Sequence, residues 1–161
     1  MKRVLAHLIS HVGPCGYSPV APGTAGSFAA FLGFIAIGPQ VWWFHLFIIV
    51  GLFFVGVWAC NVEEERLGKH DAGCLVIDEV VGFWITAFLV PYNWKWLLVA
   101  FLVFRIFDIV KPYPVNLLDK KVKKGFGVMI DDVGAGLYGM LAMLLLQSWP
   151  WFRTLLEQIP L

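Results

Sequence analysis

Three charged residues, each three positions from the next, could together bind a metal ion or a phosphate group. Arg105, Asp108 and Lys111 end an apolar run that begins at Trp94, and Pro112 follows them directly. Positions three apart are neighbours on a helix surface, so we expect Asp108 to lie between the two cations at a helix end. A ladder of structural ion pairs is the alternative interpretation of this spacing.

Two pairs of adjacent carboxylates add to this group. Asp78-Glu79 and Asp131-Asp132 each precede an apolar run, so each pair is expected at the start of a hydrophobic helix. One acidic residue there can cap a helix, but two in a row, found twice, exceed what capping needs. Oxygen-only ligands suit a hard cation such as Mg²⁺. The pairs therefore predict a magnesium site, with ion pairing to nearby cations as the structural alternative.

A loop rich in glycine and proline leads into the first apolar segment and ends in Gly-Thr-Ala-Gly-Ser, residues 23–27. Small residues at a helix start leave backbone N–H groups available to a phosphate, and Thr24 and Ser27 would add hydroxyl groups. Tight helix packing is the alternative, because small residues let helices approach closely. The packing argument also applies to three glycines that follow the carboxylate pairs: Gly82, Gly134 and Gly136.

Histidines occur in two places. His70-Asp71 precedes the first carboxylate pair and could act as a general acid or base, although the spacing supports a plain interfacial loop pair almost as well. His7 and His11 share one face of an N-terminal segment whose other face is apolar. We expect that segment to form an interfacial helix, with its histidines at the membrane surface and not as ligands.

Composition places these residues in a membrane protein. Of the 161 residues, 60% are hydrophobic and only 14% are charged, and the mean hydropathy is +0.78. Soluble domains are less apolar and more highly charged. We expect a single all-α integral membrane domain over residues 1–161. No Walker A motif supports nucleotide hydrolysis, and we expect no nucleic-acid partner.

Apolar segments predict a small bundle of four to five hydrophobic helices behind the interfacial helix. The first segment, residues 24–37, is short for a bilayer that needs about 20 residues, so we expect it to be tilted or re-entrant. The other segments are residues 41–60, residues 80–90 with an extension back towards 75, residues 94–109 and residues 133–149.

Charge distribution predicts the orientation of this bundle. With five spans, every Lys and Arg except Lys95 and Arg153 falls on one side, which the positive-inside rule makes cytoplasmic. All acidic residues except Glu157 fall on the same side. The carboxylates are therefore expected to meet at the cytoplasmic surface, where the lysine-rich residues 120–124 contact anionic lipid head groups.

In five blocks the sequence resembles the bacterial phosphatidylglycerophosphatase A family. These blocks are residues 18–27, 70–71, 78–85, 104–114 and 127–136, within a match over roughly residues 13–140. The resemblance implies a magnesium-dependent enzyme of phospholipid synthesis at the bacterial inner membrane. Such an enzyme removes the terminal phosphate of phosphatidylglycerophosphate and yields phosphatidylglycerol and inorganic phosphate.

With this resemblance, each candidate residue receives an expected role. The expected catalytic residues are His70, Asp71, Asp108 and Asp131; the phosphate-binding residues are Thr24, Ser27, Arg105 and Lys111; the metal ligands are Asp78, Glu79, Asp131 and Asp132. Asp108 joins the metal ligands or orients Arg105, and His70 or water protonates the leaving glycerol oxygen. Direct attack by water and a covalent aspartyl-phosphate route both stay open.

Other functions fit parts of the sequence. An ion transporter or channel would use the carboxylates as an ion pathway, yet the acids gather on one side and not at mid-span, where transporters place their sites. A phosphatase of another lipid phosphate and a non-enzymatic membrane scaffold are further alternatives. The sequence lacks the motifs of CDP-alcohol phosphotransferases and of histidine-based lipid phosphatases.

Overall fold

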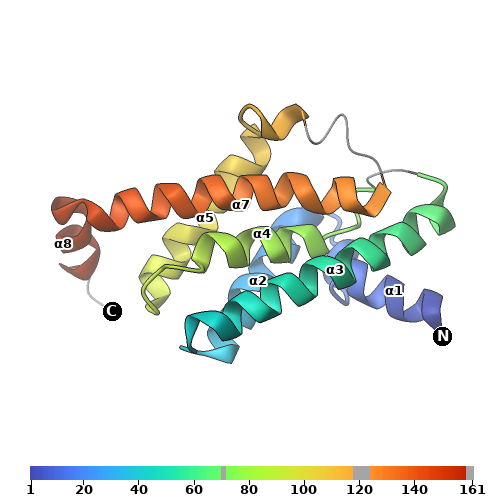
Figure 1. Cartoon of the computed structure of the whole chain (residues 1–161), viewed down its shortest axis with the longest axis horizontal. Helices are drawn as coiled ribbons and strands as arrows, with labels where there is room; N and C mark the ends of the chain where they lie inside the picture. The colour runs from blue at the N-terminus through green and yellow to red at the C-terminus, as the bar shows by residue number, and fades with distance from the viewer. Residues whose placement is uncertain (70–71, 118–123, 159–161) are drawn as a thin grey trace.

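The protein, seen here as a computed structural model, is described over residues 1–69, 72–117 and 124–158, and every regular element in these ranges is a helix (Figure 1). The elements are α1 (Lys2–Ser10), the short 3₁₀ helix η1 (Cys15–Tyr17), α2 (Pro22–Ile37), α3 (Trp42–Leu67), α4 (Ile77–Ala87), α5 (Trp94–Val110), α7 (Lys124–Ser148) and α8 (Pro150–Gln158). The predicted all-α class is confirmed for this part of the chain.

Helix α4 forms the centre of the bundle. All of its residues except Glu79 are buried, and it packs against α2, α3, α5 and α7. Figure 1 shows α4 between α7 and α3. Its 11 residues rise only about 16 Å, roughly half of the hydrocarbon thickness of a bilayer. The third apolar segment is therefore a buried core helix, too short to be the independent span that the five-span scheme assumed.

Two helices, α3 and α7, are long and apolar enough to cross a membrane. In the most apolar part of α3 only 28% is buried inside the molecule, and in the most apolar part of α7 only 44% is buried. Much of their apolar surface therefore faces outward, and Phe47, Phe54 and Leu145 are largely exposed. Extensive exposed apolar surface is expected where a protein contacts lipid, and it is unusual for the core helices of a soluble protein.

Glycines bring α4 and α7 into close contact. A Cβ atom on Gly136 would lie 2.5 Å from the carbonyl oxygen of Gly82. Thr86 Oγ1 donates a hydrogen bond across this contact to the Gly136 carbonyl, at 3.2 Å. The predicted close packing is therefore confirmed for Gly82 and Gly136, whereas Gly134 faces Val115 instead. This contact fixes α4 relative to the acidic part of α7.

Helix α7 begins earlier than the sequence predicted. Residues 131–132 were expected to open the fifth helix, but α7 begins at Lys124. Gly125 allows this early turn to pack on α3: its N–H donates to Asn61 Oδ1 at 2.9 Å, and a Cβ atom there would lie 2.5 Å from the Val57 carbonyl oxygen. The second carboxylate pair consequently lies about two turns inside the helix.

The predicted N-terminal helix is present as α1, which packs against α3 near the N-terminus of the chain (Figure 1). Its apolar residues Val4, Leu5 and Leu8 are exposed. Its histidine face turns inward, so that His7 contacts α3 and His11 is only 2% exposed. The expectation that both histidines lie at the membrane surface is therefore wrong for His11, which is buried within the protein, whereas the His7 side chain stays 24% exposed.

Candidate active site

Three carboxylates from two helices converge beside the α4–α7 contact. Asp78 and Glu79 lie in the first turn of α4, as predicted, and Asp132 faces them from α7. One oxygen of each carboxylate lies within 4.8 Å of the others. Asp78 is 8% exposed and Asp132 is 3% exposed, so water screens their mutual repulsion poorly.

These carboxylates fit a hard divalent cation. Asp78 Oδ1, Glu79 Oε2 and Asp132 Oδ2 are buried and have no hydrogen-bond partner among the described residues. Burying ionised carboxylates without partners is costly, so the arrangement calls for a compensating positive charge. The donor set consists of oxygen alone, as Mg²⁺ prefers. Binding of Mg²⁺ by these residues nevertheless stays a prediction.

Asp131, the neighbour of Asp132, pairs with a cation that directly follows α5. Its carboxylate forms an ion pair with Lys111 Nζ. Helix α5 ends at Val110, directly before Lys111, which adopts a left-handed backbone conformation with a φ angle of 42°. The predicted end of this helix is thus confirmed. Lys111, however, was expected beside Asp108, and it instead reaches α7 because it has left the helix.

Arg105 connects α5 with α2. Its Nη1 atom donates hydrogen bonds to Asp108 Oδ2 at 2.6 Å and to Ser27 Oγ at 3.3 Å. The first half of the predicted ladder, Arg105 with Asp108, is therefore present. Arg105 Nε is buried and has no hydrogen-bond partner among the described residues. This guanidinium therefore has an N–H group left that could donate a hydrogen bond to a phosphate oxygen.

The first turn of α2 closes the site on a further side. A Cβ atom on Gly23 would collide with the Glu79 carboxylate and lie 3.4 Å from Arg105 Nη1. An alanine at this position would require the Glu79 carboxylate to move away from α2. Ser27 Oγ donates to the Gly23 carbonyl at 2.9 Å, and Thr24 is exposed in the same turn. The N–H groups at this helix start carry partial positive charge towards the site.

The structure brings most of the predicted residues together, with some exceptions. His70 and Asp71 lie outside the described residues, and so do Lys120, Lys121 and Lys123, so their roles stay predictions. Sequence reasoning missed the pairing of Lys111 with Asp131, which no local pattern signals. It also missed the contact of Gly23 with Glu79, although small residues at a predicted helix start were an available signal.

Taken together, the site places buried carboxylates next to cationic groups from separate elements. The carboxylates come from α4 and α7, the guanidinium of Arg105 comes from α5, and the N–H groups come from the start of α2. Such a site can hold a metal ion and a phosphate group side by side and stabilise charge that develops on phosphate oxygens. This chemistry suits the transfer of a phosphoryl group.

Known proteins provide an independent comparison. The family model described as Phosphatidylglycerophosphatase A matches residues 8–147. The phosphatidylglycerophosphatase A of Escherichia coli (strain K12) is 37% identical over 131 residues, which cover 81% of this chain and 76% of that protein. The phosphatidylglycerophosphatase A of Haemophilus influenzae is 38% identical over 145 residues, which cover 89% of each.

A Bacteroides thetaiotaomicron protein, whose name assigns it provisionally to the phosphatidylinositol-3-phosphatases, is 42% identical over 134 residues. The match covers 78% of this chain and 83% of that protein. No solved structure matches the chain significantly.

Proposed function

Because the chain belongs to the phosphatidylglycerophosphatase A family, and is thus a phosphatase, we propose that it hydrolyses phosphatidylglycerophosphate with the help of Mg²⁺. The products are phosphatidylglycerol and inorganic phosphate. One observation carries this proposal. Three buried carboxylate oxygens have no hydrogen-bond partner among the described residues, and the guanidinium of Arg105 lies in the same site. The names of the two family relatives support the substrate.

In the proposed reaction, Asp78, Glu79 and Asp132 hold Mg²⁺. Asp108 and Asp131 stand beside them, close enough to act on Asp132 electrostatically. An ion held there would supply Lewis-acid chemistry and would neutralise charge on the phosphate. The carboxylates would fix its position.

Phosphate oxygens are bound by cationic groups on the other side of the site. Arg105 presents a planar set of donors that matches phosphate geometry, while Lys111 supplies a compact charge. Asp108 positions Arg105 through their 2.6 Å hydrogen bond. Ser27, Thr24 and the N–H groups at the start of α2 complete the phosphate site. Water supplies the oxygen that joins phosphorus as the bond to the glycerol oxygen breaks, and His70, next to Asp71 in the sequence, supplies the proton to that glycerol oxygen.

The proposed location is the bacterial inner membrane, with the site at its cytoplasmic surface. Two helices of sufficient length and apolarity support a membrane location, as does their outward-facing apolar surface. Basic residues at the end of the bundle where α1 begins, α3 ends and α7 begins support the orientation; they are Lys2, Arg3, Arg66 and Lys124. The acyl chains of the substrate then stay in the bilayer while its terminal phosphate enters the site.

A second candidate substrate deserves a direct comparison, because the Bacteroides relative is named for a different lipid phosphate. Both substrates are phosphate monoesters on a lipid head group, so the same metal and guanidinium chemistry serves both. They differ in the leaving group, which is a glycerol hydroxyl in one case and an inositol hydroxyl in the other.

Release of inorganic phosphate by the purified protein in detergent micelles tests the proposal. We expect release from phosphatidylglycerophosphate in Mg²⁺, loss of release in EDTA, and much slower release from phosphatidylinositol 3-phosphate. Faster turnover of the inositol lipid would replace the proposed substrate. A folded protein that releases phosphate from neither lipid in Mg²⁺ would contradict the proposed reaction.

A further inference from the structure

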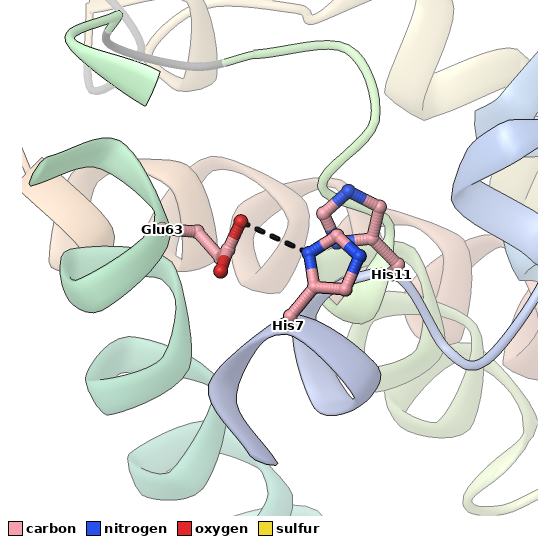
Figure 2. A group of neighbouring side chains, drawn as sticks. All are labelled: His7, His11 and Glu63. Atoms are coloured by element: carbon pink, nitrogen blue, oxygen red, sulfur yellow. Dashed lines mark hydrogen bonds and ion pairs between the residues drawn. The ribbon is translucent and has the colours of Figure 1, made fainter. Parts of the chain in front are cut away.

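A second cluster of polar side chains lies between α1 and α3, on residues that the proposed reaction does not use. His7 and His11 follow one another by one helical turn, and Glu63 faces them from α3 (Figure 2). One ligand atom from each of the three lies within 4.8 Å of the others. His7 Nδ1 and Glu63 Oε2 are 3.1 Å apart.

Two of these three side chains are removed from solvent. Glu63 is 0% exposed and His11 is 2% exposed. Glu63 Oε1 is buried and has no hydrogen-bond partner among the described residues.

Neighbouring side chains hold the outer atoms of the cluster. The outer contacts are Tyr17 OH with His7 Nε2 and Ser10 Oγ with His11 Nδ1 at 3.0 Å. Metal-binding imidazoles and carboxylates usually have such outer partners, which fix the orientation of the ligand. The cluster is therefore already organised in the way that metal ligands are.

We propose that His7, His11 and Glu63 form a binding site for a divalent transition-metal ion of the zinc class. Two imidazoles with one carboxylate suit Zn²⁺, whereas the oxygen-only set on α4 and α7 suits Mg²⁺. Bonds of about 2.0–2.1 Å require the ligand atoms to draw closer together than the 4.8 Å limit. Three protein ligands with water in the fourth position form a common type of zinc site.

Arg66 is the competitor of the metal ion in this cluster. Its Nη2 lies 2.8 Å from Glu63 Oε2 and 3.3 Å from His7 Nδ1, so it neutralises Glu63 when no ion is bound. The Arg66 side chain is 43% exposed and can turn into solvent when an ion enters. Replacing Arg66 with glutamine should therefore strengthen metal binding, a result that a purely structural ion pair does not produce.

A bound ion would join α1 to α3 and thereby hold the segment that leads towards the active site. The Ser10 carbonyl on α1 accepts a hydrogen bond from the N–H of Val76, at 2.8 Å. Val76 directly precedes α4, whose first turn carries Asp78. We therefore expect Zn²⁺ to raise the thermal denaturation temperature of the protein.

Cobalt(II) is the probe for this site, because four-coordinate Co²⁺ absorbs visible light much more strongly than six-coordinate Co²⁺. We expect the metal-free, full-length protein in micelles to give strong absorption with one equivalent of Co²⁺. The His11→Gln and Glu63→Gln variants should bind at least about 100-fold more weakly. Arg66→Gln should bind Co²⁺ more tightly.

Two control variants should retain the strong absorption. Asp132→Asn alters the carboxylate site, and His45→Gln replaces a buried histidine elsewhere on α3.

Weak absorption by the wild-type protein would overturn the proposal and leave the cluster as an ion-pair network only. Strong absorption that persists in both His11→Gln and Glu63→Gln, or that disappears in Asp132→Asn, would also overturn it. If one glutamine variant fails to elute as a native protein–micelle complex, the other decides the outcome. Phosphate release in Mg²⁺ is measured on the same samples, so a failure of the proposed reaction is seen separately.

Discussion

Asp131 and Asp132 are adjacent in the sequence, yet their carboxylates have different neighbours. Asp132 faces Asp78 and Glu79 across the α4–α7 contact, whereas Asp131 pairs with Lys111 from the end of α5. On a helix, adjacent residues point about 100° apart. One pair can therefore serve both a metal ion and the cation that binds phosphate, and this is how the site joins its two kinds of charge.

The Lys111–Asp131 pair predicts a measurable coupling between two residues. Lys111→Met removes the Lys111–Asp131 ion pair, in which the Asp131 side chain is only 6% exposed, so this variant should lose stability. The double variant with Asp131→Asn should be less destabilised than the two single changes added together, by roughly 1–3 kcal/mol. Chemical denaturation in micelles measures the four free energies of unfolding. Strictly additive effects would contradict the ion pair.

The sequence could predict that the acidic residues lie close together, because a carboxylate at the edge of an apolar segment has few favourable places to go. It must face a polar site or pay a large desolvation cost. The sequence could not predict in the same way which cation pairs with which carboxylate. Lys111 reaches Asp131 only because it adopts a left-handed conformation after the last residue of α5, and a helical-neighbour rule assumes that the helix continues.

At the level of elements, glycines decide how closely α4 and α7 approach. The contact between Gly82 and Gly136 leaves no space for a methyl group, and it positions Asp78 relative to Asp132. Within a bilayer the hydrophobic effect contributes little to helix association, so helices there associate through close packing of this kind. Thr86 adds a hydrogen bond to the same contact.

Gly136→Ala should therefore separate α4 from α7 and weaken the site. The added Cβ atom would lie 2.5 Å from the Gly82 carbonyl oxygen, and overpacking of this kind costs about 1–3 kcal/mol. We expect a lower denaturation temperature and slower phosphate release.

Gly51→Ala is the matched control, because a Cβ atom on Gly51 of α3 meets no atom within 4 Å. Alanine favours a helix over glycine by up to about 1 kcal/mol, so this variant should be neutral or slightly stabilised. Equal behaviour of the two variants would show that the glycine contact does not set the distance between α4 and α7.

Helix identities were largely predictable from apolar segments, but two helix properties were not. The start of α7 at Lys124 depends on the contact of Gly125 with α3, which is tertiary and leaves no local signal. The contact of His7 with α3 is made to Glu63, which lies 56 residues away in the sequence. Hydrophobic periodicity in α1 showed two faces, but it could not show which face meets the protein.

For the molecule as a whole, the outward apolar surface of α3 and α7 and the location of its charges favour a membrane protein with its site at one surface. The end of α3 and the start of α7 lie at the same end of the bundle, near the N-terminus (Figure 1). This end also carries the histidine cluster. Both proposed metal sites therefore involve elements at the end that we assign to the cytoplasm.

Cysteine labelling tests this orientation. In a protein whose native cysteines are replaced by alanine, a cysteine at exposed Gln40, between α2 and α3, should react with a membrane-impermeant maleimide in intact bacterial cells. A cysteine at exposed Glu65, near the other end of α3, should react only after the inner membrane is permeabilised. The reverse pattern, or labelling of both positions in intact cells, would show that the assigned orientation is wrong.

The most direct test of the proposed active site is the Mg²⁺ dependence of phosphate release by Asp132→Asn. This change removes one negative charge from the carboxylate cluster and preserves the shape of the side chain. The variant should release phosphate from phosphatidylglycerophosphate at least about 100-fold more slowly at low Mg²⁺. It should regain part of this activity as Mg²⁺ is raised, while His45→Gln should behave like the wild-type protein. Full activity of a folded Asp132→Asn protein, at the same Mg²⁺ concentration as the wild type, would contradict the proposed metal site.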